Sequence, residues 1–201
     1  MELSGKVALM RVDFNVPIDN GVIMDDTRIR VPLKTIQDLQ KHGAKVVLMS
    51  HWGKTTDGDK IYSLRQLVPV IEKIYGSSVT FITNYLDEGM RGFIDKVPQN
   101  DIILLENLRF YKQEEDCDLN FAAKLASLGD IFVNEAFSVS HRKHASVSGV
   151  PQFHPSILGK TFKKEIKNIE TFFNKESGKR MAIIGGSKLL TKVKLLKKLS
   201  L

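Results

Sequence analysis

The chain has 201 residues, of which 42% are apolar and 26% are charged, a composition typical of a folded globular protein. This length suffices for one well-buried core and the start of a second domain, whereas two complete domains would be crowded. No apolar run approaches the roughly 20 residues that a membrane span requires, and a single cysteine, Cys117, suits a reducing compartment. We therefore expect a cytoplasmic protein without a membrane segment.

The net charge of +7 and the pI near 9.4 would also suit a nucleic-acid partner. Most of the basic residues, however, are spread along the chain. The densest cluster lies at the C-terminus and consists of Lys192, Lys194, Lys197 and Lys198. It has no interleaved aromatic residues that could stack on bases, so we expect small anionic ligands and no nucleic acid.

Six short apolar runs rich in β-branched residues predict strands that are buried on both faces. In chain order they are Lys6–Val12, Ala44–Ser50, Ser78–Ile82, Asp101–Leu105, Asp130–Val133 and Met181–Ile184. Helical spacing of apolar residues predicts helices over Leu33–Leu39, Leu64–Tyr75, Phe121–Leu128 and Phe162–Phe173. Ser63 and Gln66 form a capping-box pattern before the second helix. The alternation predicts a three-layer α/β fold, Rossmann-like, with a mostly parallel sheet of about six strands between helices.

Two segments break this alternation. Residues 134–160 have little helical periodicity and contain Pro151 and Pro155, so we predict a long functional loop there. The polar segment Asn174–Lys179 predicts a domain boundary, with one domain over residues 1–174 and the incomplete start of another over 175–201. Because the last residues read as the middle of a helix, we expect this chain to be a piece of a longer, two-domain protein.

Polar residues follow four of the predicted strands. They are Asp13 and Asn15, Ser50 and His51, Glu106, Asn107 and Arg109, and Asn134 and Glu135. In open α/β sheets, ligands bind beyond the carboxyl ends of the strands. Guanidinium and imidazole groups suit phosphate and carboxylate, and Asp and Asn suit hydroxyl groups. For any one of these residues a merely solvated strand end is an equal alternative, but four strand ends together predict a ligand site.

Other motifs are weaker. No G-x-G-x-x-G is present, which disfavours a nicotinamide-dependent oxidoreductase. Gly159-Lys160-Thr161 imitates the end of a phosphate-binding loop, but it follows a predicted loop instead of a strand and lacks the first glycine. His141 and His144 could form a metal pair, yet no third ligand has sensible spacing. We expect no bound metal in this part of the protein.

Six segments, in order, resemble the phosphoglycerate kinase family. They are Arg11–Pro17, Asp25–Arg30, Ser50–Gly53, Leu105–Phe110, Asn134–Ser146 and Gly185–Lys188 leading to Lys192. The resemblance covers the chain from end to end, and it implies the N-terminal, 3-phosphoglycerate-binding half of that enzyme together with the start of its nucleotide-binding domain.

The resemblance also implies roles for individual residues. Asp13 and Asn15 would orient the glycerate, and Arg28 would contact its carboxylate and the transferring phosphoryl group. The full set of implied substrate-binding residues is Asp13, Phe14, Asn15, Arg28, His51, Trp52, Gly53, Lys54, Arg109 and Arg142, in which His51, Arg109 and Arg142 form a basic patch. Lys188 and Lys192 would bind nucleotide phosphates, and Arg28 and Lys188 would be the catalytic residues.

The implied reaction is the glycolytic, reversible transfer of a phosphoryl group between 1,3-bisphosphoglycerate and ADP, giving 3-phosphoglycerate and ATP. Mg-ATP and Mg-ADP would be substrates of the full-length, monomeric enzyme.

The chain departs from the family pattern at three positions. It has Lys54 where the family frequently has arginine, Ser138 where glycine is frequent, and Thr191 where aspartate is frequent. Most of the nucleotide-binding domain is missing, so we expect no activity from this chain alone. A free-standing glycerate-phosphate-binding domain is the alternative.

Overall fold

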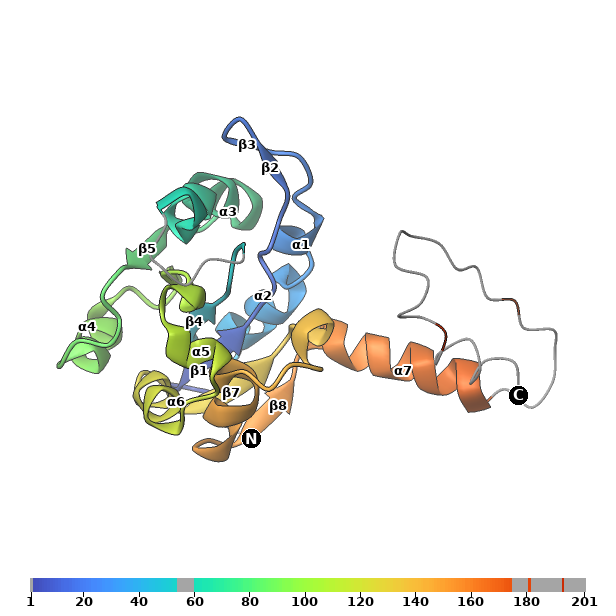
Figure 1. Cartoon of the computed structure of the whole chain (residues 1–201). Coiled ribbons are helices and arrows are strands. Elements are labelled where there is room, and N and C mark those ends of the chain that lie inside the picture. Colours follow the sequence, from blue (N-terminus) through green and yellow to red (C-terminus); the bar gives the residue numbers. More distant parts are fainter. Residues whose placement is uncertain (1, 54–59, 175–180, 182–192, 194–201) are drawn as a thin grey trace. The chain divides into compact units, whose positions relative to one another are not determined.

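The computed structural model describes residues 2–53 and 60–174, together with Met181 and Val193, and its centre is a six-stranded sheet (Figure 1). Its strands lie in the order β5-β6-β4-β1-β7-β8, and all neighbouring pairs are parallel. They are β1 (Val7–Arg11), β4 (Lys45–Met49), β5 (Val79–Ile82), β6 (Ile102–Leu105), β7 (Ile131–Asn134) and β8 (Ser156–Leu158). A separate hairpin joins β2 (Ile18–Asp19) to β3 (Val22–Ile23).

Helices cover both faces of the sheet, so the predicted three-layer α/β fold is confirmed. Alternate residues of β1 belong to two core clusters, Ala8 and Met10 to one and Val7 and Leu9 to the other. The first cluster includes residues of α1 (Thr27–Arg30), α2 (Leu33–Lys41) and α3 (Val68–Tyr75). The second includes residues of α4 (Met90–Lys96) and α6 (Leu119–Ala126). Strands buried on both faces are mostly apolar, which explains the apolar runs, and the buried charges of Arg11 in β1 and Lys45 in β4 are exceptions.

The remaining described helices are short turns and one long helix. Five are 3₁₀ turns, η1 (Lys60–Tyr62), η2 (Leu64–Leu67), η3 (Leu108–Phe110), η4 (Phe137–Val139) and η6 (Val150–Gln152), and η5 (Ala145–Gly149) is a π-helical turn. The others are α5 (Lys112–Glu115) and α7 (Lys160–Asn174). The four predicted helices are therefore present, with ends shifted by a few residues. Ser63 caps the turn before α3 by accepting the N–H of Arg65 at 3.3 Å, whereas the Gln66 amide donates to the Ser63 carbonyl.

The sixth strand of the sheet is not the predicted one. Met181–Ile184 lies outside the described residues except for Met181, whereas β8 falls in the stretch that we expected to be a loop. That expectation was wrong because β8 has only three residues and a single neighbour, β7, so its sequence carries little periodicity. Ile157 packs against the core from this strand.

The chain divides into two compact units, Met1–Lys167 and Asn168–Leu201. Every described residue of the candidate site belongs to the first unit. The predicted boundary segment after Asn174 lies outside the described residues. Within the described part of the chain, no helix combines the length and apolarity needed to cross a membrane.

The order of the strands creates a crevice at the carboxyl edge of the sheet. From β1 the chain continues to β4 on one side, whereas from β7 it continues to β8 on the other side. Adjacent strands whose following loops diverge in this way form a topological switch point, where α/β proteins bind ligands. Asp13 follows β1 and Ser138 follows β7, so both lie at this point.

Candidate functional site

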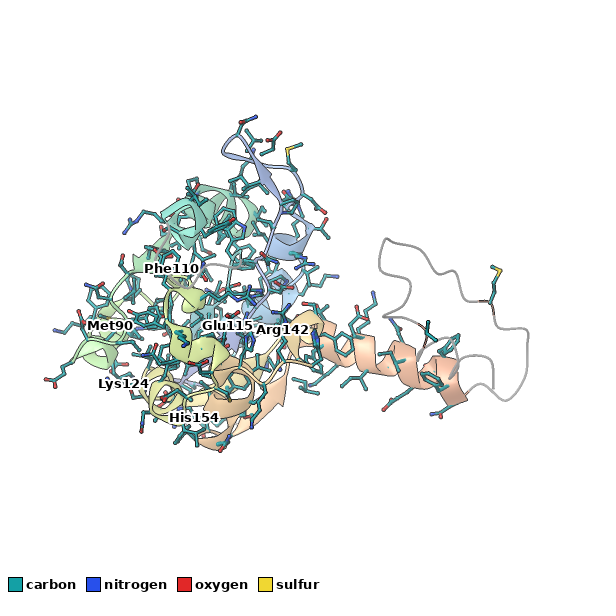
Figure 2. The ribbon with its side chains drawn as sticks, viewed as in Figure 1. Met90, Phe110, Glu115, Lys124, Arg142 and His154 are labelled. Carbon is teal, nitrogen blue, oxygen red and sulfur yellow. The ribbon has the colours of Figure 1, made fainter. Side chains whose placement is uncertain are left out.

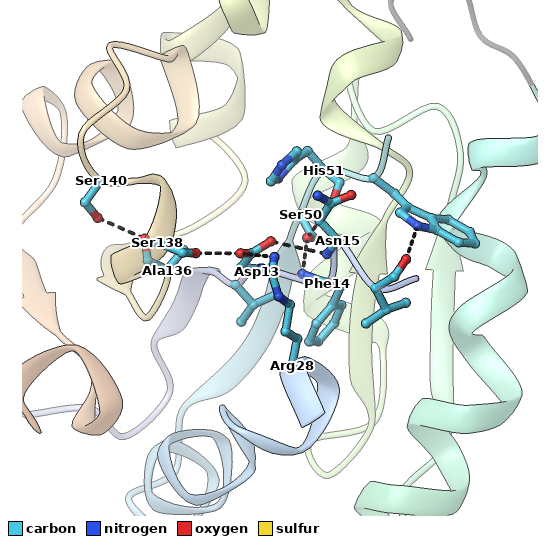
Figure 3. A network of polar contacts seen from close by, with 12 residues as sticks. Asp13, Phe14, Asn15, Arg28, Ser50, His51, Ala136, Ser138 and Ser140 are labelled. Carbon is cyan, nitrogen blue, oxygen red and sulfur yellow. Dashed lines mark hydrogen bonds and ion pairs between the residues drawn. The ribbon is translucent and has the colours of Figure 1, made fainter. Parts of the chain in front are cut away.

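The carboxylate of Asp13 is the hub of a polar network at the switch point (Figure 3). Its Oδ2 accepts hydrogen bonds from Arg28 Nη1 at 2.7 Å and from the hydroxyl of Ser138, and its Oδ1 accepts the backbone N–H of Asn15 at 3.2 Å. A carboxylate offers about four acceptor positions, so one is left for a ligand hydroxyl. We call Asp13, Arg28 and Ser138 the Asp13 cluster.

Arg28 is held at this point by the short helix α1. Four residues cannot form a stable helix alone, so the contacts around α1 must stabilise it. Asp25 accepts the N–H of Thr27 at 2.8 Å, and the hydroxyl of Tyr75 donates to the carbonyl of Ile29 at 2.6 Å. The Arg28 side chain remains 48% exposed, so its guanidinium can reach both Asp13 and a ligand.

Asn15 is oriented by Gly53, because the backbone N–H of Gly53 donates to its Oδ1 at 3.0 Å. The carboxamide therefore presents its Nδ2 donor to a ligand. Gly53 has a φ of +69°, and a Cβ at this position would lie 2.4 Å from the ring of Tyr62. Only glycine fits such a position without strain.

Phe14 and Trp52 anchor the two site segments in the core of the protein. Both side chains are buried in the first core cluster, and the indole Nε1 of Trp52 donates to the carbonyl of Val16 at 2.8 Å. The backbone N–H of Phe14 donates to the hydroxyl of Ser50 at 2.9 Å. These contacts fix the path of the chain between Asp13 and Gly53.

A cavity of about 530 Å³ lies beside the Asp13 cluster, and we call it the anion cavity. It is lined by Asn15, His51, Gly53, Arg109, Glu115 and Arg142. Arg109 is 4% exposed, donates to the carbonyl of Gly53, and lies 2.9 Å from the carboxylate of Glu115. Figure 2 shows Arg142 and Glu115 close to one another on this wall. Burial lowers the pKa of Arg109 and Glu115 offsets part of this effect, so the guanidinium stays charged.

His51 differs from its neighbours because it is not a cation. Burial lowers its pKa to about 2, and the charges of Arg11, Arg109 and Arg142 act in the same direction. The expected basic patch thus has two guanidinium groups, Arg109 and Arg142, and one neutral imidazole. This group can donate or accept a hydrogen bond, but it adds no charge at physiological pH.

The first backbone amides of α7 are hydrogen-bonded within the protein. Gly159-Lys160-Thr161 follows strand β8 directly, so our expectation of a preceding loop was wrong. The backbone N–H of Lys160 donates to the hydroxyl of Thr35, and that of Thr161 donates to Glu135, each at 3.0 Å. Both of these backbone N–H groups therefore already donate hydrogen bonds to side-chain oxygens of the protein.

The described residues include no group of three or more His, Cys, Asp or Glu side chains arranged to hold a metal ion. Of the two histidines near this site, His144 lies 3.7 Å from the carboxylate of Glu114, and His141 is exposed.

The structure brings most of the predicted site residues together at the carboxyl edge of the sheet, beside several residues that were not predicted. Lys54, Lys188 and Lys192 lie outside the described residues. The missed residues are Arg11, Glu114, Glu115, Ser138 and Ser146. Arg11 carried a usable signal, because a charge at the end of the apolar strand β1 must find a buried partner.

Comparison with known proteins identifies the family. The family model described as phosphoglycerate kinase matches residues 1–201. The chain belongs to the phosphoglycerate kinase family. The chain is 46% identical over 199 residues to the phosphoglycerate kinase of Wolbachia pipientis subsp. Culex pipiens (strain wPip). This alignment covers 99% of the chain and 50% of that protein. Its counterpart in Aquifex aeolicus is 41% identical over 201 residues, covering 99% and 51%.

Solved phosphoglycerate kinases have the same fold as this chain. The enzyme of Pyrococcus horikoshii OT3 aligns with a TM-score of 0.90 at 29% identity, over 99% of this chain and 51% of that one. The enzyme of Coxiella burnetii aligns with a TM-score of 0.86 at 32% identity, over 99% and 50%. The chain spans about half the length of the curated relatives it matches.

Proposed function

We propose that this chain forms the 3-phosphoglycerate-binding part of a phosphoglycerate kinase. The observation that carries the proposal is the anion cavity, in which two guanidinium groups stand beside the Asp13 cluster at the carboxyl edge of the sheet. A phosphorylated hydroxy acid needs cations for its anionic groups and a hydrogen-bond acceptor for its hydroxyl group, and both are available here.

In this proposal Arg109 and Arg142 bind the phosphate of 3-phosphoglycerate, while Asp13 and Asn15 orient its glycerate. Arg28 contacts the carboxylate and the phosphoryl group that moves between 1,3-bisphosphoglycerate and ADP. Phosphoryl transfer requires mainly alignment and neutralisation of charge, so no covalent residue or general base is needed. The half-exposed guanidinium of Arg28 suits this role because it contacts Asp13 and still reaches solvent.

We further propose that Lys188 and Lys192 bind the phosphates of Mg-ATP or Mg-ADP in the longer protein, and that residues 1–174 form the substrate domain. Family membership supports a glycolytic kinase. A cytoplasmic location and a monomeric state complete the proposal.

Binding of 3-phosphoglycerate to the 201-residue chain tests the proposal directly. Calorimetry is expected to detect weak binding that Arg109→Ala or Arg142→Ala reduces by tenfold or more, and that weakens with added salt because exposed charges are screened within about 8 Å at physiological ionic strength. Arg91→Ala removes a guanidinium that pairs with Asp130 away from the cavity and is the matched control. Unchanged affinity in both cavity variants would disprove the site.

A coupled assay of 1,3-bisphosphoglycerate formation tests the activity. The isolated chain is expected to show no turnover, whereas the full-length protein turns over and loses about two to three decades of rate on Arg28→Ala or Lys188→Ala. Steady turnover by the 201-residue chain that Arg28→Ala abolishes would contradict the assignment of this chain as one part of the enzyme.

A further inference from the structure

A fully buried arginine stands directly behind the anion cavity. Arg11, the last residue of β1, is 0% exposed. Its Nη2 lies 3.1 Å from Nδ1 of His51, its Nε donates to the hydroxyl of Ser146 at 2.8 Å, and its Nη1 donates to the carbonyl of Val12. A guanidinium buried this completely requires a nearby negative charge.

That charge is Glu114, which is also 0% exposed. Its Oε1 accepts the hydroxyl of Ser146 at 2.6 Å, and its Oε2 accepts the backbone N–H of the same serine at 2.8 Å. Burial alone would raise the pKa of Glu114, but His144, Arg11 and Ser146 together hold it below its usual value. Glu114 is therefore ionised and balances Arg11.

These contacts allow only one direction of donation. An arginine has donors and no acceptor, so the hydroxyl oxygen of Ser146 must accept from Arg11, and its single hydrogen must point to Glu114. For the same reason Nδ1 of His51 must accept from Arg11. A neutral imidazole whose Nδ1 accepts carries its hydrogen on Nε2.

We propose that Glu114 is a positioning residue which, through Ser146 and Arg11, fixes His51 as the neutral Nε2–H tautomer that donates a hydrogen bond to an anion in the cavity. We call Glu114, Ser146, Arg11 and His51 the buried relay. The inference rests on the proposed function only for the identity of the anion, the phosphate or carboxylate of 3-phosphoglycerate.

The charges around His51 support this assignment. The imidazole faces the guanidinium groups of Arg11, Arg109 and Arg142 and the ring of His144, so a proton added to it would be repelled by three arginine cations. The two nearby glutamates already have partners: Glu114 accepts a hydrogen bond from Ser146, and Glu115 forms an ion pair with Arg109. A neutral donor complements the two guanidinium groups of the cavity without increasing the repulsion among them.

Nitrogen NMR of the imidazoles tests the relay without any ligand. The wild-type chain is expected to show His51 as a single tautomer, with hydrogen on Nε2 and no titration between pH 5 and 8. A hydrogen on Nδ1, or titration of His51 in this range, overturns the proposal.

Variants test whether Glu114 and Arg11 set the tautomer. In Arg11→Met/Glu114→Gln both charges leave together, which keeps the interior neutral, and His51 is expected to populate both tautomers. Arg91→Met/Asp130→Asn removes an ion pair at the amino end of the sheet and is the matched control, with His51 unchanged. Ser146→Ala should also increase the population of the second His51 tautomer, but by a smaller amount. If His51 keeps one tautomer in both relay variants, the proposal is wrong.

Binding of 3-phosphoglycerate then separates this inference from the proposed function. His51→Gln places an amide donor near the position of Nε2 and is expected to keep affinity within about threefold, whereas the shorter His51→Asn loses about tenfold. Equal losses in the two variants overturn the donor role. A fixed Nε2–H tautomer in a chain that binds no 3-phosphoglycerate supports the relay and overturns the proposed function.

Discussion

The buried relay and the Asp13 cluster each place an arginine near a carboxylate, but in opposite surroundings. Ser146 lies between Arg11 and Glu114, whereas Arg28 contacts Asp13 directly. Arg11 and Glu114 are both 0% exposed, whereas the side chains of Arg28 and Asp13 are 48% and 10% exposed. Water can solvate Arg28 if its partner is lost, and it cannot reach Arg11. The relay can therefore fix the geometry of His51, whereas the Asp13 cluster leaves Arg28 free to exchange its partner for a ligand.

The largest contrast in unfolding free energy is expected between the variants Glu114→Ala and Asp13→Ala, with the greater loss in Glu114→Ala. Glu114→Ala leaves Arg11 buried without its balancing charge, and an uncompensated buried charge typically costs about 3–5 kcal/mol. An exposed pair contributes about 0–1 kcal/mol. Urea unfolding of the two variants should show this contrast, and equal losses of unfolding free energy would remove the distinction between the regions.

Acid should destabilise the chain through the relay. The pKa of His51 is about 2 in the folded chain and 6.5 for the free side chain. Below pH 6.5 the unfolded chain therefore binds a proton that the folded chain does not, so stability is present above this pH and lost as pH falls. Between pH 6.5 and 5 the loss is about 2 kcal/mol.

Urea midpoints at pH 8, 6.5 and 5 measure this loss, and His51→Gln is expected to reduce it. Glu114 adds a further loss below its unfolded pKa of about 4.5, since its folded pKa is lower still. A His51→Gln chain with the same acid sensitivity as the wild type would assign the effect to other groups.

The smallest loss of unfolding free energy is expected for Ser138→Ala. Asp13 keeps its contacts with Arg28 and with the backbone of Asn15, so unfolding free energy should fall by less than about 1 kcal/mol. Ser146→Ala, the corresponding change in the relay, should cost more because both of its partners are buried. Thermal unfolding of the two alanine variants makes the comparison, and a larger loss for Ser138→Ala would reverse it.

The strands could be predicted where local sequence is sufficient. The five confirmed strands are mostly apolar, so local composition marks them. The β2–β3 hairpin was missed although Asn20-Gly21 is a typical hairpin turn, with φ of +47° and +78°. β8 lacked such a signal, because its pairing depends on β7.

The Asp13 cluster was partly predictable because Asp13 and Arg28 belong to recognisable segments. The relay was not, since its contacts join Arg11 to Ser146 across 135 residues, Arg11 to His51 across 40, and Glu114 to Ser146 across 32. Within the acidic stretch around Cys117, Glu114 turns inward and Glu115 reaches Arg109.

The sequence by itself determined the α/β alternation, the family resemblance and the kinds of side chain at the carboxyl edge of the sheet. Those follow from local periodicity and from the order of short motifs along the chain. Only the tertiary structure decided that Arg11 and Glu114 are buried together and that His51 is neutral. Burial and hydrogen-bond direction depend on which groups surround an atom in space, and the fold alone brings those groups together.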